Sequence, residues 1–318
     1  MKKVYITTDI PDIAEELLKK QFEVVVNTDN KFLSKEDLIK IGCEYDAILS
    51  SLTNIFDKDT LSKCTKTKIF ANYAVGFNNF DIDYIKEKNI IVTNTPGVLS
   101  DTTAETAISL LFAVSRRIVE ADRFVRDGNW EGFSPKLLLG KDIYNKTLGI
   151  IGAGRIGHRF AEKLRGFHMK ILYNNRNRDL CFEKSFNAEY CEIDDLLKRS
   201  DVVTIHVPLT EETRYMITKK EINLMKEDSI LINTSRGSVI KEDDLIEALE
   251  NKRIYGAGLD VFEDEPNVNS RFFKLNNVVL LPHIGSASKE TREMMASIAA
   301  KNIIRILEGG EPINLVYK

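Results

Sequence analysis

The stretch "TLGIIGAGRIGHRFAEKLRGF", residues 147–167, decides the fold of this chain. It reads as a buried strand, a G-x-G-x-x-G turn at Gly152, Gly154 and Gly157, and an amphipathic helix. The first glycine permits the tight turn, the second lets backbone approach a pyrophosphate, and the third allows close helix–sheet contact. The helix N-terminus offers free N–H donors to phosphate. The stretch predicts a dinucleotide-binding unit; glycines that merely turn the chain are the alternative.

Short runs rich in β-branched residues alternate with amphipathic segments upstream of this stretch. "KVYITTD" precedes "PDIAEELLKK", and "FEVVVNT" precedes "SKEDLIKIG". Such alternation indicates parallel strands with crossover helices. We therefore predict an α/β chain of two doubly wound, Rossmann-like parallel-sheet domains with an active-site cleft between them.

Length and one helical pattern place the domain boundary. A chain of 318 residues that is 43% hydrophobic exceeds the usual single domain and can fill two cores. A pattern of roughly 27 residues that begins at Ser100 predicts one long helix, with Ser100 and Asp101 as cap candidates. The segment "DGNWEGFSPKLLLG" follows it. We expect this helix to join the two domains, with a boundary near residue 98.

Composition excludes several function classes. The net charge of −3, the pI of about 6.0 and the mixed charges argue against nucleic acid as a partner. The N-terminal apolar run is too short for a signal peptide or membrane span, so we expect no membrane partner and a cytoplasmic location. The four cysteines lack zinc-ligand spacing and are too few for a disulfide scaffold, which predicts reduced, structural thiols and no metal.

The residues after the next predicted strand, "MKILYNN", bear on the cofactor. An Asp or Glu about 20 residues beyond the glycines normally binds the adenosine ribose hydroxyls. Asn175 occupies that place, without a charge that would repel a 2′-phosphate, and Arg176 and Arg178 follow it. Both arginines can contact such a phosphate. NADP(H) is therefore favoured; the alternative is an ordinary solvated loop and a protein that also binds NAD(H).

Four further predicted strands end in polar groups. "DVVTIHVP" ends at His206 and Pro208, "SILINTSRG" at Arg236, and "NVVLLPHIG" at His283, while "IYGAGLDVFEDEP" carries Asp260 near its end. Ligands of open parallel sheets bind at the carboxyl ends of the strands, so we expect these groups to converge beside the dinucleotide.

A cleft of this kind suits hydride transfer to a carbonyl. The developing alkoxide needs a proton donor, for which histidine is suited, and a carboxylate partner keeps the imidazole protonated. The planar fork of an arginine binds the carboxylate of a 2-oxo acid and polarises the neighbouring carbonyl. Arg236, Glu265 and His283 provide this set. Spacing alone does not choose Glu265 over Glu263, or His283 over His206.

The motifs together carry a family resemblance over almost the whole chain. From "NYAVGFNNFDID" through "LGIIGAGRIG", "INTSRG", "GAGLDVFEDEP" and "LPHIGSAS", the chain resembles the D-isomer-specific 2-hydroxyacid dehydrogenases, and most closely their glyoxylate/hydroxypyruvate reductase branch. The resemblance implies that Arg236 binds the substrate carboxylate and that Glu265 pairs with His283, the acid/base. It also implies that backbone at Val75 and Gly76 helps to hold that carboxylate.

The resemblance extends to the cofactor, the domains and the assembly. It implies that Asp260 contacts the nicotinamide amide, that residues 1–98 and 288–318 form a discontinuous substrate domain around 99–287, and that the chain dimerises through the cofactor domain. The cofactor-binding residues that we expect are Gly152, Gly154, Arg155, Ile156, Gly157, Asn175, Arg176, Arg178, His206, Val207, Pro208, Thr234, Asp260 and His283.

The combined expectation is an NADPH-preferring glyoxylate/hydroxypyruvate reductase that yields glycolate or D-glycerate. A D-lactate dehydrogenase fits "NYAVGFNN" less well, and a 3-phosphoglycerate dehydrogenase would carry a regulatory domain after the last helix. A dinucleotide-sensing binding protein of the same fold is the alternative from another class; the lack of a long peptide-binding extension argues against it. Trp130 is read as a packing residue of the connecting loop, with substrate contact as the alternative.

Overall fold

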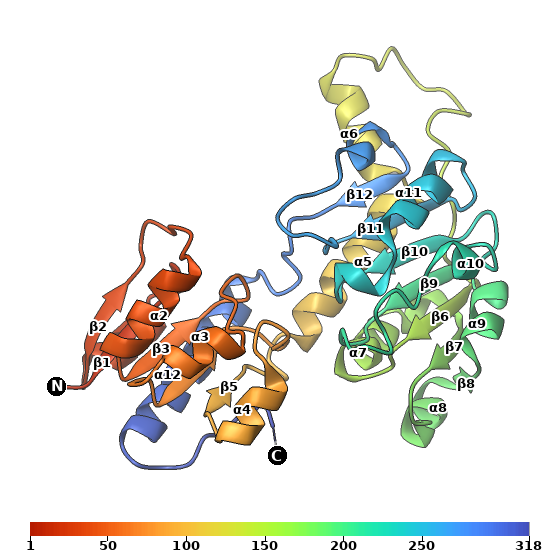
Figure 1. Ribbon diagram of the computed structural model, residues 1–318. Helices are drawn as coiled ribbons and strands as arrows, with labels where there is room; N and C mark the ends of the chain where they lie inside the picture. The colour runs from red at the N-terminus through yellow and green to blue at the C-terminus, as the bar shows by residue number, and fades with distance from the viewer. Residues whose placement is uncertain (318) are drawn as a thin grey trace. The chain divides into compact units, whose positions relative to one another are not determined.

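The computed structural model describes residues 1–317, which fall into two compact units (Figure 1). Unit 1 comprises Met1–Leu99 together with the described residues from Ala287 onward, and unit 2 comprises Ser100–Ser286. No helix among residues 1–317 has the length and apolar character that crossing a membrane requires. All four cysteines are free thiols.

Unit 1 contains a five-stranded parallel sheet in the order β2-β1-β3-β4-β5. This is one of the two common orders of doubly wound sheets. Its elements are β1 (Lys3–Ile6), α1 (Ile13–Lys19), β2 (Glu23–Val26), α2 (Lys35–Glu44), β3 (Ala47–Ser50), α3 (Lys58–Lys63), β4 (Ile69–Asn72), α4 (Ile82–Lys88), β5 (Val92–Thr93) and α12 (Lys289–Leu307).

Helix α12 completes unit 1 from the far end of the chain. Its side chains at Met295, Ala299 and Ile303 are buried, as their helical spacing predicts, and the helix packs on α1, β3 and β4. Ser288 caps its N-terminus by accepting the N–H of Thr291. Unit 1 is therefore built from two segments that are separated in sequence by the whole of unit 2.

Unit 2 contains a seven-stranded parallel sheet in the order β12-β11-β10-β9-β6-β7-β8. The chain order reverses between β6 and β9, as in Rossmann sheets. Its elements are α5 (Ser100–Ser115), α6 (Ile118–Arg126), β6 (Thr147–Ile151), α7 (Arg155–Lys163), η1 (Arg165–Phe167), β7 (Lys170–Asn174), α8 (Leu180–Phe186), β8 (Glu189–Tyr190), α9 (Ile193–Arg199), β9 (Val202–Ile205), α10 (Lys219–Ile222), β10 (Ile230–Asn233), η2 (Gly237–Val239), α11 (Glu242–Glu250), β11 (Gly256–Leu259), η3 (Ser270–Lys274) and β12 (Val278–Leu280).

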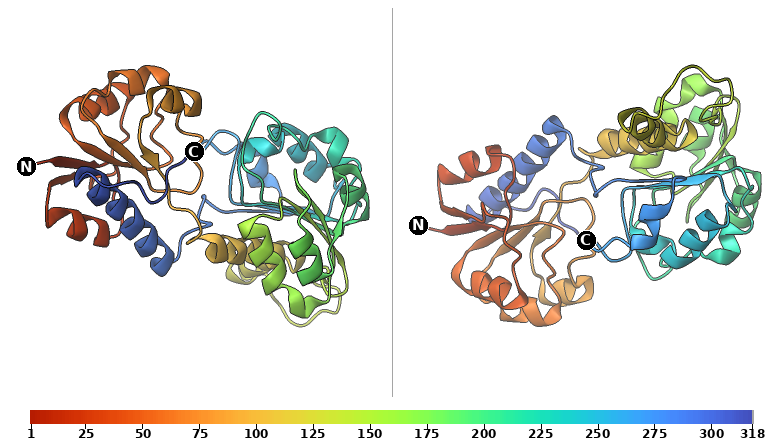
Figure 2. Two further views of the ribbon diagram at one scale, coloured as in Figure 1. Left: turned by 90° about the horizontal axis from the view of Figure 1, so that it is seen from below. Right: turned by 90° about the horizontal axis from the view of Figure 1, so that it is seen from above.

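Helices cover both faces of the unit 2 sheet (Figure 2). A hydrophobic cluster on one face includes Leu148, Ile150 and Phe160, and a second cluster includes Leu231, Leu245 and Leu259. Strands that are buried on both faces appear in sequence as continuous apolar runs, which explains why "LGII" and "SILIN" are recognisable as strands. The predicted fold class, two parallel-sheet α/β units, is confirmed.

The single long helix predicted from Ser100 is wrong, because the chain forms α5 and α6 with a break between them. Arg117 adopts a left-handed conformation with φ of 54°. The carbonyl oxygen of Ser115, at the end of α5, accepts the N–H of Lys141 at 2.7 Å. A segment later in the chain therefore occupies an acceptor that a longer helix would use. Periodicity could not reveal this tertiary contact.

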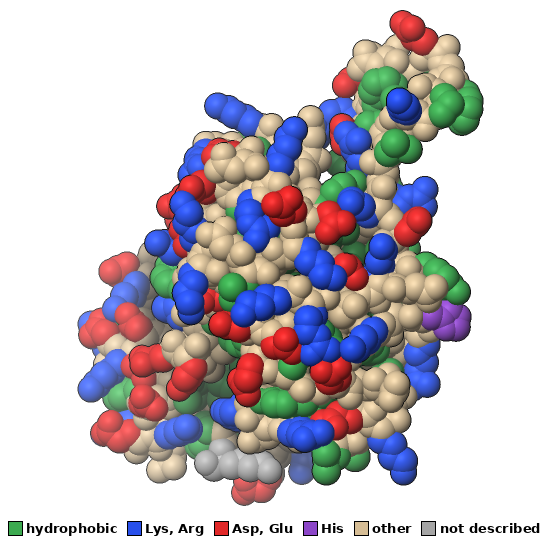
Figure 3. Space-filling view, turned by 90° about the vertical axis from the view of Figure 1, so that its right-hand side faces the viewer, with side chains coloured by type: hydrophobic (Ala, Val, Ile, Leu, Met, Phe, Trp, Pro, Cys, Tyr) green, Lys and Arg blue, Asp and Glu red, His purple; other side chains and the backbone are tan. Residues whose placement is uncertain are grey.

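The segment after α6 is exposed, which also corrects the reading of Trp130 as a packing residue. The Trp130 side chain is 60% exposed and its Nε1 donates to the carbonyl oxygen of Gly132 at 3.0 Å. Phe133 is 91% exposed, and hydrophobic side chains gather on the part of the molecule that projects at the top of Figure 3.

Candidate active site

The turn between β6 and α7 is shaped by close contacts at two of its glycines. Gly152 has φ of 95°, and an added Cβ would lie 2.8 Å from the carbonyl carbon of His206. An added Cβ on Gly157 would lie 2.6 Å from the carbonyl oxygen of Gly152, so α7 packs directly on the turn. Gly154 differs: its φ is −86°, and an added Cβ would meet no heavy atom of the described residues within 4 Å. No protein contact requires glycine there, which fits the predicted approach of a pyrophosphate.

The carboxyl ends of β6 and β9 provide further features of a dinucleotide site. Arg155 and Ile156 begin α7 beside the glycine turn, at the point where the strand order reverses. His206, Val207 and Pro208 follow β9 directly. Two buried polar atoms, His206 Nδ1 and Thr234 Oγ1, have no hydrogen-bond partner within residues 1–317. Buried polar atoms are normally bonded, so these two fit a site that a polar ligand completes.

His206 is held in a neutral form. Burial lowers its pKa to about 3, because a charged imidazolium is poorly solvated there. Its Nε2 lies 3.0 Å from Thr204 Oγ1. Of the two histidines that sequence left open, His283 pairs with a carboxylate, whereas His206 contacts a hydroxyl group, which favours His283 as the acid/base.

Asn175, Arg176 and Arg178 have different local roles. Asn175 Oδ1 accepts the N–H of Ala153 at 2.7 Å, so this side chain ties the residue after β7 to the glycine turn. Arg178 forms a bidentate pair with Glu183, with Nε–Oε1 and Nη2–Oε2 distances of 2.6 and 2.8 Å. Arg176 is exposed and has no ion pair among the described residues. The two arginines are therefore not equally available to a ligand.

The pair Glu265–His283 is formed directly in the structure. His283 Nδ1 lies 2.6 Å from Glu265 Oε2, and both side chains are about one-third exposed. Burial pushes the pKa of Glu265 upward. The hydrogen bond and charge of His283, the N–H of Phe262 and the charge of Arg236 outweigh burial, so the pKa lies below its usual range. Glu265 is thus ionised at neutral pH.

Asp260 holds the backbone that carries His283. Its side chain is 1% exposed, and its two oxygens accept the N–H groups of Ile284 and Gly285, each at 2.7 Å. Burial raises the pKa of Asp260, while the two N–H donors and the charge of His283 oppose that rise. The carboxylate therefore fixes the loop directly after His283. A contact from Asp260 to a nicotinamide amide stays a prediction.

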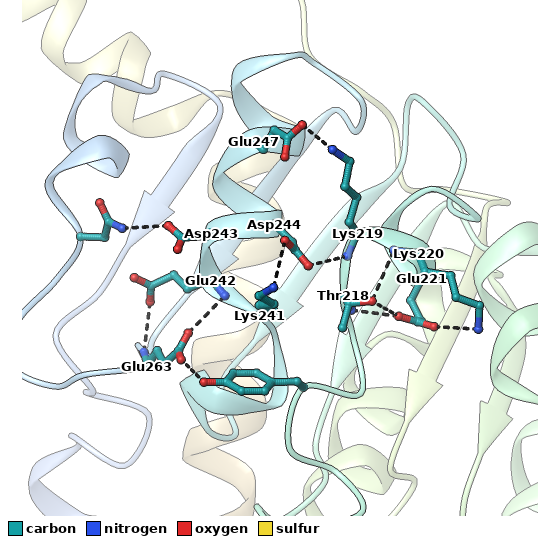
Figure 4. Close-up of polar contacts among 12 residues, drawn as sticks. Thr218, Lys219, Lys220, Glu221, Lys241, Glu242, Asp243, Asp244, Glu247 and Glu263 are labelled. Carbon is teal, nitrogen blue, oxygen red and sulfur yellow. Dashed lines mark hydrogen bonds and ion pairs between the residues drawn. The ribbon is translucent and has the colours of Figure 1, made fainter.

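Glu263, the competing carboxylate, is engaged elsewhere (Figure 4). It accepts a hydrogen bond from Tyr215 Oη, and its Oε2 accepts the N–H of Glu242 at the start of α11, at 3.3 Å. Glu242 Oε2 in turn accepts the N–H of Glu263 at 3.1 Å. Of the two glutamates that spacing could not separate, only Glu265 pairs with a histidine in the described residues.

Arg236 reaches the same cluster through a close backbone contact. An added Cβ on Gly237 would lie 1.9 Å from the carbonyl carbon of Phe262, so only glycine lets this loop lie against the segment that leads to Glu265. Burial lowers the pKa of Arg236 and the charge of Glu265 raises it. The guanidinium stays cationic, since an arginine side chain is effectively always protonated. A cation, an ionised carboxylate and an imidazole therefore interact within unit 2.

This cluster has the chemistry that reduction of a carbonyl beside a carboxylate needs. An imidazole next to an ionised carboxylate can give a proton to a developing alkoxide. A guanidinium binds carboxylate with a planar fork and stabilises negative charge as it develops. No set of side chains within residues 1–317 resembles a metal site.

In unit 1, Val75 and Gly76 lie in the loop after β4, at the carboxyl end of the sheet. Their N–H groups have no hydrogen-bond acceptor within residues 1–317. Successive free N–H groups form a binding place for anionic oxygen. The loop thus has the chemistry that the predicted carboxylate site requires.

Several supporting side chains were not identified from sequence. Asn233 is 1% exposed; its Oδ1 accepts the N–H of Ser235, and its Nδ2 donates to the carbonyl oxygen of Arg236. Asn72 and Asn94 hold the loop of Val75 in the same way. An Asn at or just after the end of an apolar strand was the available signal, because a buried amide is costly unless it is bonded.

Comparison with known proteins agrees with this geometry. The model of the "D-isomer specific 2-hydroxyacid dehydrogenase, NAD binding domain" family matches residues 108–285. The glyoxylate reductase of Thermococcus litoralis is 49% identical, over 99% of this chain and 97% of that protein. A crystal structure of a protein from Thermus thermophilus matches with a TM-score of 0.93 and 36% identity, over 99% of this chain and 100% of that one. An NADPH-dependent glyoxylate/hydroxypyruvate reductase from Sinorhizobium meliloti, in complex with NADP and malonate, matches with a TM-score of 0.89 and 30% identity, over 99% and 96%.

Proposed function

Because the chain belongs to the D-isomer specific 2-hydroxyacid dehydrogenase family, we propose that it reduces glyoxylate or hydroxypyruvate, forming glycolate or D-glycerate. The observation that carries this proposal is the Glu265–His283 pair with the charge of Arg236 beside it. The 49% identity to a glyoxylate reductase supports this substrate class over the D-lactate and 3-phosphoglycerate types.

The proposed roles divide between the two units, with dinucleotide binding in unit 2 and part of the substrate site in unit 1. When bound, the nicotinamide supplies a hydride to the carbonyl carbon of the substrate. His283 gives a proton to the carbonyl oxygen, and Glu265 stabilises the imidazolium before that step. Arg236 binds the substrate carboxylate and polarises the adjacent carbonyl. In unit 1, the N–H groups of Val75 and Gly76 are the proposed donors to a substrate carboxylate. Hydride and proton together complete the two-electron reduction.

A panel of 2-oxo acids tests the substrate. We expect the highest kcat/KM for glyoxylate or hydroxypyruvate, with pyruvate and 3-phosphohydroxypyruvate poorer, when oxidation of NADPH or NADH is followed by absorbance. A protein that binds NADPH with ordinary affinity but turns over none of these acids would instead be a dinucleotide sensor, and the proposed activity would be wrong.

The proposed cofactor preference is NADP(H). Asn175 brings no charge to the place where an acidic side chain would repel a 2′-phosphate, and Arg176 is a cation without an ion-pair partner among residues 1–317. The Sinorhizobium meliloti relative, described as NADPH-dependent, was solved with NADP. These observations favour Arg176 as the main contact to the phosphate.

Arg176→Gln and Arg178→Gln form a matched pair for this preference. We expect Arg176→Gln to raise the KM for NADPH about 10-fold or more, because a charge-assisted bond to phosphate is lost. Its KM for NADH should not change. Arg178→Gln should have a smaller effect, because Glu183 already engages that guanidinium at 2.6 Å. Equal effects of the two substitutions, or none from Arg176→Gln, would contradict the assignment.

The proposed assembly is a homodimer formed through unit 2. Ile118, Val119 and Val125 on α6 are 50%, 43% and 55% exposed, and α6 has no buried residue. A cavity of about 610 Å³ beside α6 is lined by Val119 and by charged side chains that include Arg123 and Glu250. An apolar helix face next to such a cavity suits a second copy of the same surface. Sedimentation equilibrium should give a mass twice that of the chain. Val125→Glu should lower this mass toward that of a single chain.

A further inference from the structure

We propose that Asn94 and Asn72 are positioning residues for the substrate carboxylate. Their side-chain amides orient N–H groups of the loop after β4 outward. This inference rests on the proposed function, since it concerns the N–H donors assigned above to substrate. The two asparagines lie at or directly after the ends of neighbouring strands, Asn72 on β4 and Asn94 after β5. Neither is expected to touch the substrate.

Three consecutive carbonyl groups of the loop accept hydrogen bonds from donors within unit 1. Thr95 N–H donates to the carbonyl oxygen of Ala74 at 2.8 Å. Asn94 Nδ2 donates to that of Val75 at 2.7 Å, and Asn72 Nδ2 donates to that of Gly76 at 2.8 Å. Three consecutive carbonyl oxygens are therefore committed to inner donors.

The planarity of the peptide bond converts these contacts into N–H directions. In a trans peptide the C=O of one residue and the N–H of the next point in opposite directions. Holding the carbonyls of Ala74, Val75 and Gly76 inward therefore directs the N–H groups of the three following residues outward. None of these N–H groups, on Val75, Gly76 and Phe77, has an acceptor within residues 1–317. Asn94 controls the second of the three donors and Asn72 the third.

The two amides are themselves fixed by burial and bonding. Asn72 is 0% exposed and Asn94 is 9% exposed. Asn72 Oδ1 accepts from Asn79 Nδ2 at 3.3 Å and from Ser50 Oγ at 3.4 Å, which sets the orientation of its amide. The backbone N–H of Asn94 donates to the carbonyl oxygen of Asn314 at 3.1 Å. Donors held this rigidly need no reorganisation when substrate binds.

The test compares Asn94→Leu with Asn27→Leu in the full-length protein. Asn27 is a matched control, because it is also 9% exposed and its Nδ2 donates to the carbonyl oxygens of Thr7 and Lys31 at 3.0 and 2.9 Å. Both substitutions remove a buried amide donor in the same way. Both should lower the Tm by similar amounts, but only Asn94→Leu should raise the KM for glyoxylate, about 10-fold or more.

A second readout separates binding from turnover. The Kd of oxamate, an unreactive analogue of a 2-oxo acid, should rise in parallel for Asn94→Leu in the presence of NADPH, with the KM for NADPH unchanged. If Asn94→Leu does not fold, Asn94→Ser supplies the same comparison, because its hydroxyl is too short to reach the Val75 oxygen. An unchanged KM and oxamate Kd in an active variant, or equal increases in Asn27→Leu, would overturn the inference. A wild-type protein without turnover would overturn the proposed function instead.

Discussion

Replacing His283 with Gln is expected to lower kcat for glyoxylate reduction by about 10²- to 10⁴-fold, the usual contribution of a general acid. Gln keeps a polar side chain of similar size but cannot give up a proton near neutral pH. Nδ1 of His283 lies 2.6 Å from an ionised Glu265, which leaves the other ring nitrogen for the substrate. NADPH binding should persist, because the glycine turn and Arg176 remain intact. Stopped-flow turnover together with fluorescence titration of NADPH measures both quantities.

His158→Gln is the matched control for this result. His158 also pairs with a carboxylate, with Nε2 3.0 Å from Asp179 Oδ2, and its exposure of 35% is close to the 32% of His283. Loss of a histidine–carboxylate pair by itself should therefore lower the stability of both variants. The kcat should fall only in His283→Gln. Retained turnover in His283→Gln, or an equal loss in His158→Gln, would show that His283 is not the proton donor.

Gly237→Ala is expected to be among the most destabilising substitutions in the loops of unit 2. The new Cβ would lie 1.9 and 2.0 Å from the carbonyl carbon and oxygen of Phe262 and 2.4 Å from the nitrogen of Glu263. These are backbone atoms, so relief requires the two loops to separate. We expect the free energy of unfolding in urea to fall by about 1–3 kcal/mol or more. Because Arg236 and Glu265 would move apart, kcat/KM should fall as well.

Gly154→Ala provides the opposite pattern. Its φ of −86° suits any residue, and an added Cβ would meet no heavy atom of the described residues within 4 Å. The free energy of unfolding should stay at the wild-type value while NADPH binds more weakly, because the methyl group occupies the approach of the pyrophosphate. A Gly237→Ala protein as stable as wild type would contradict the close packing of the two loops.

Much of the fold and the site was predictable because parallel sheets leave simple signals. Buried strands such as "LGII" and "SILIN" are continuous apolar runs, and their carboxyl ends meet at one edge. The residues directly after these strands, Arg236 among them, were therefore expected to be neighbours. Gly152 was recognisable from its spacing to Gly154 and Gly157. Its positive φ in the structure explains why the turn needs glycine at this position.

Other features depend on tertiary contacts that no local pattern encodes. Glu263 and Glu265 are two residues apart in a loop. Tyr215 and the N–H group at the start of α11 both donate hydrogen bonds to Glu263, so Glu265 is the one that pairs with His283. The end of α5 depends on Lys141, which is distant in sequence. The capture of Arg178 by Glu183 likewise depends on how α8 follows β7.

The most direct measurement of the proposed chemistry uses NADPH that carries deuterium at both hydrogen positions of C4 of the nicotinamide. Purified protein is incubated with this NADPH and hydroxypyruvate, and the product is analysed by mass spectrometry and by its configuration. We expect D-glycerate with one deuterium at C2 and one proton from solvent on the new hydroxyl group. A glycerate product without deuterium at C2, L-glycerate, or failure to consume both hydroxypyruvate and, in a parallel reaction, glyoxylate would contradict hydride transfer at this site.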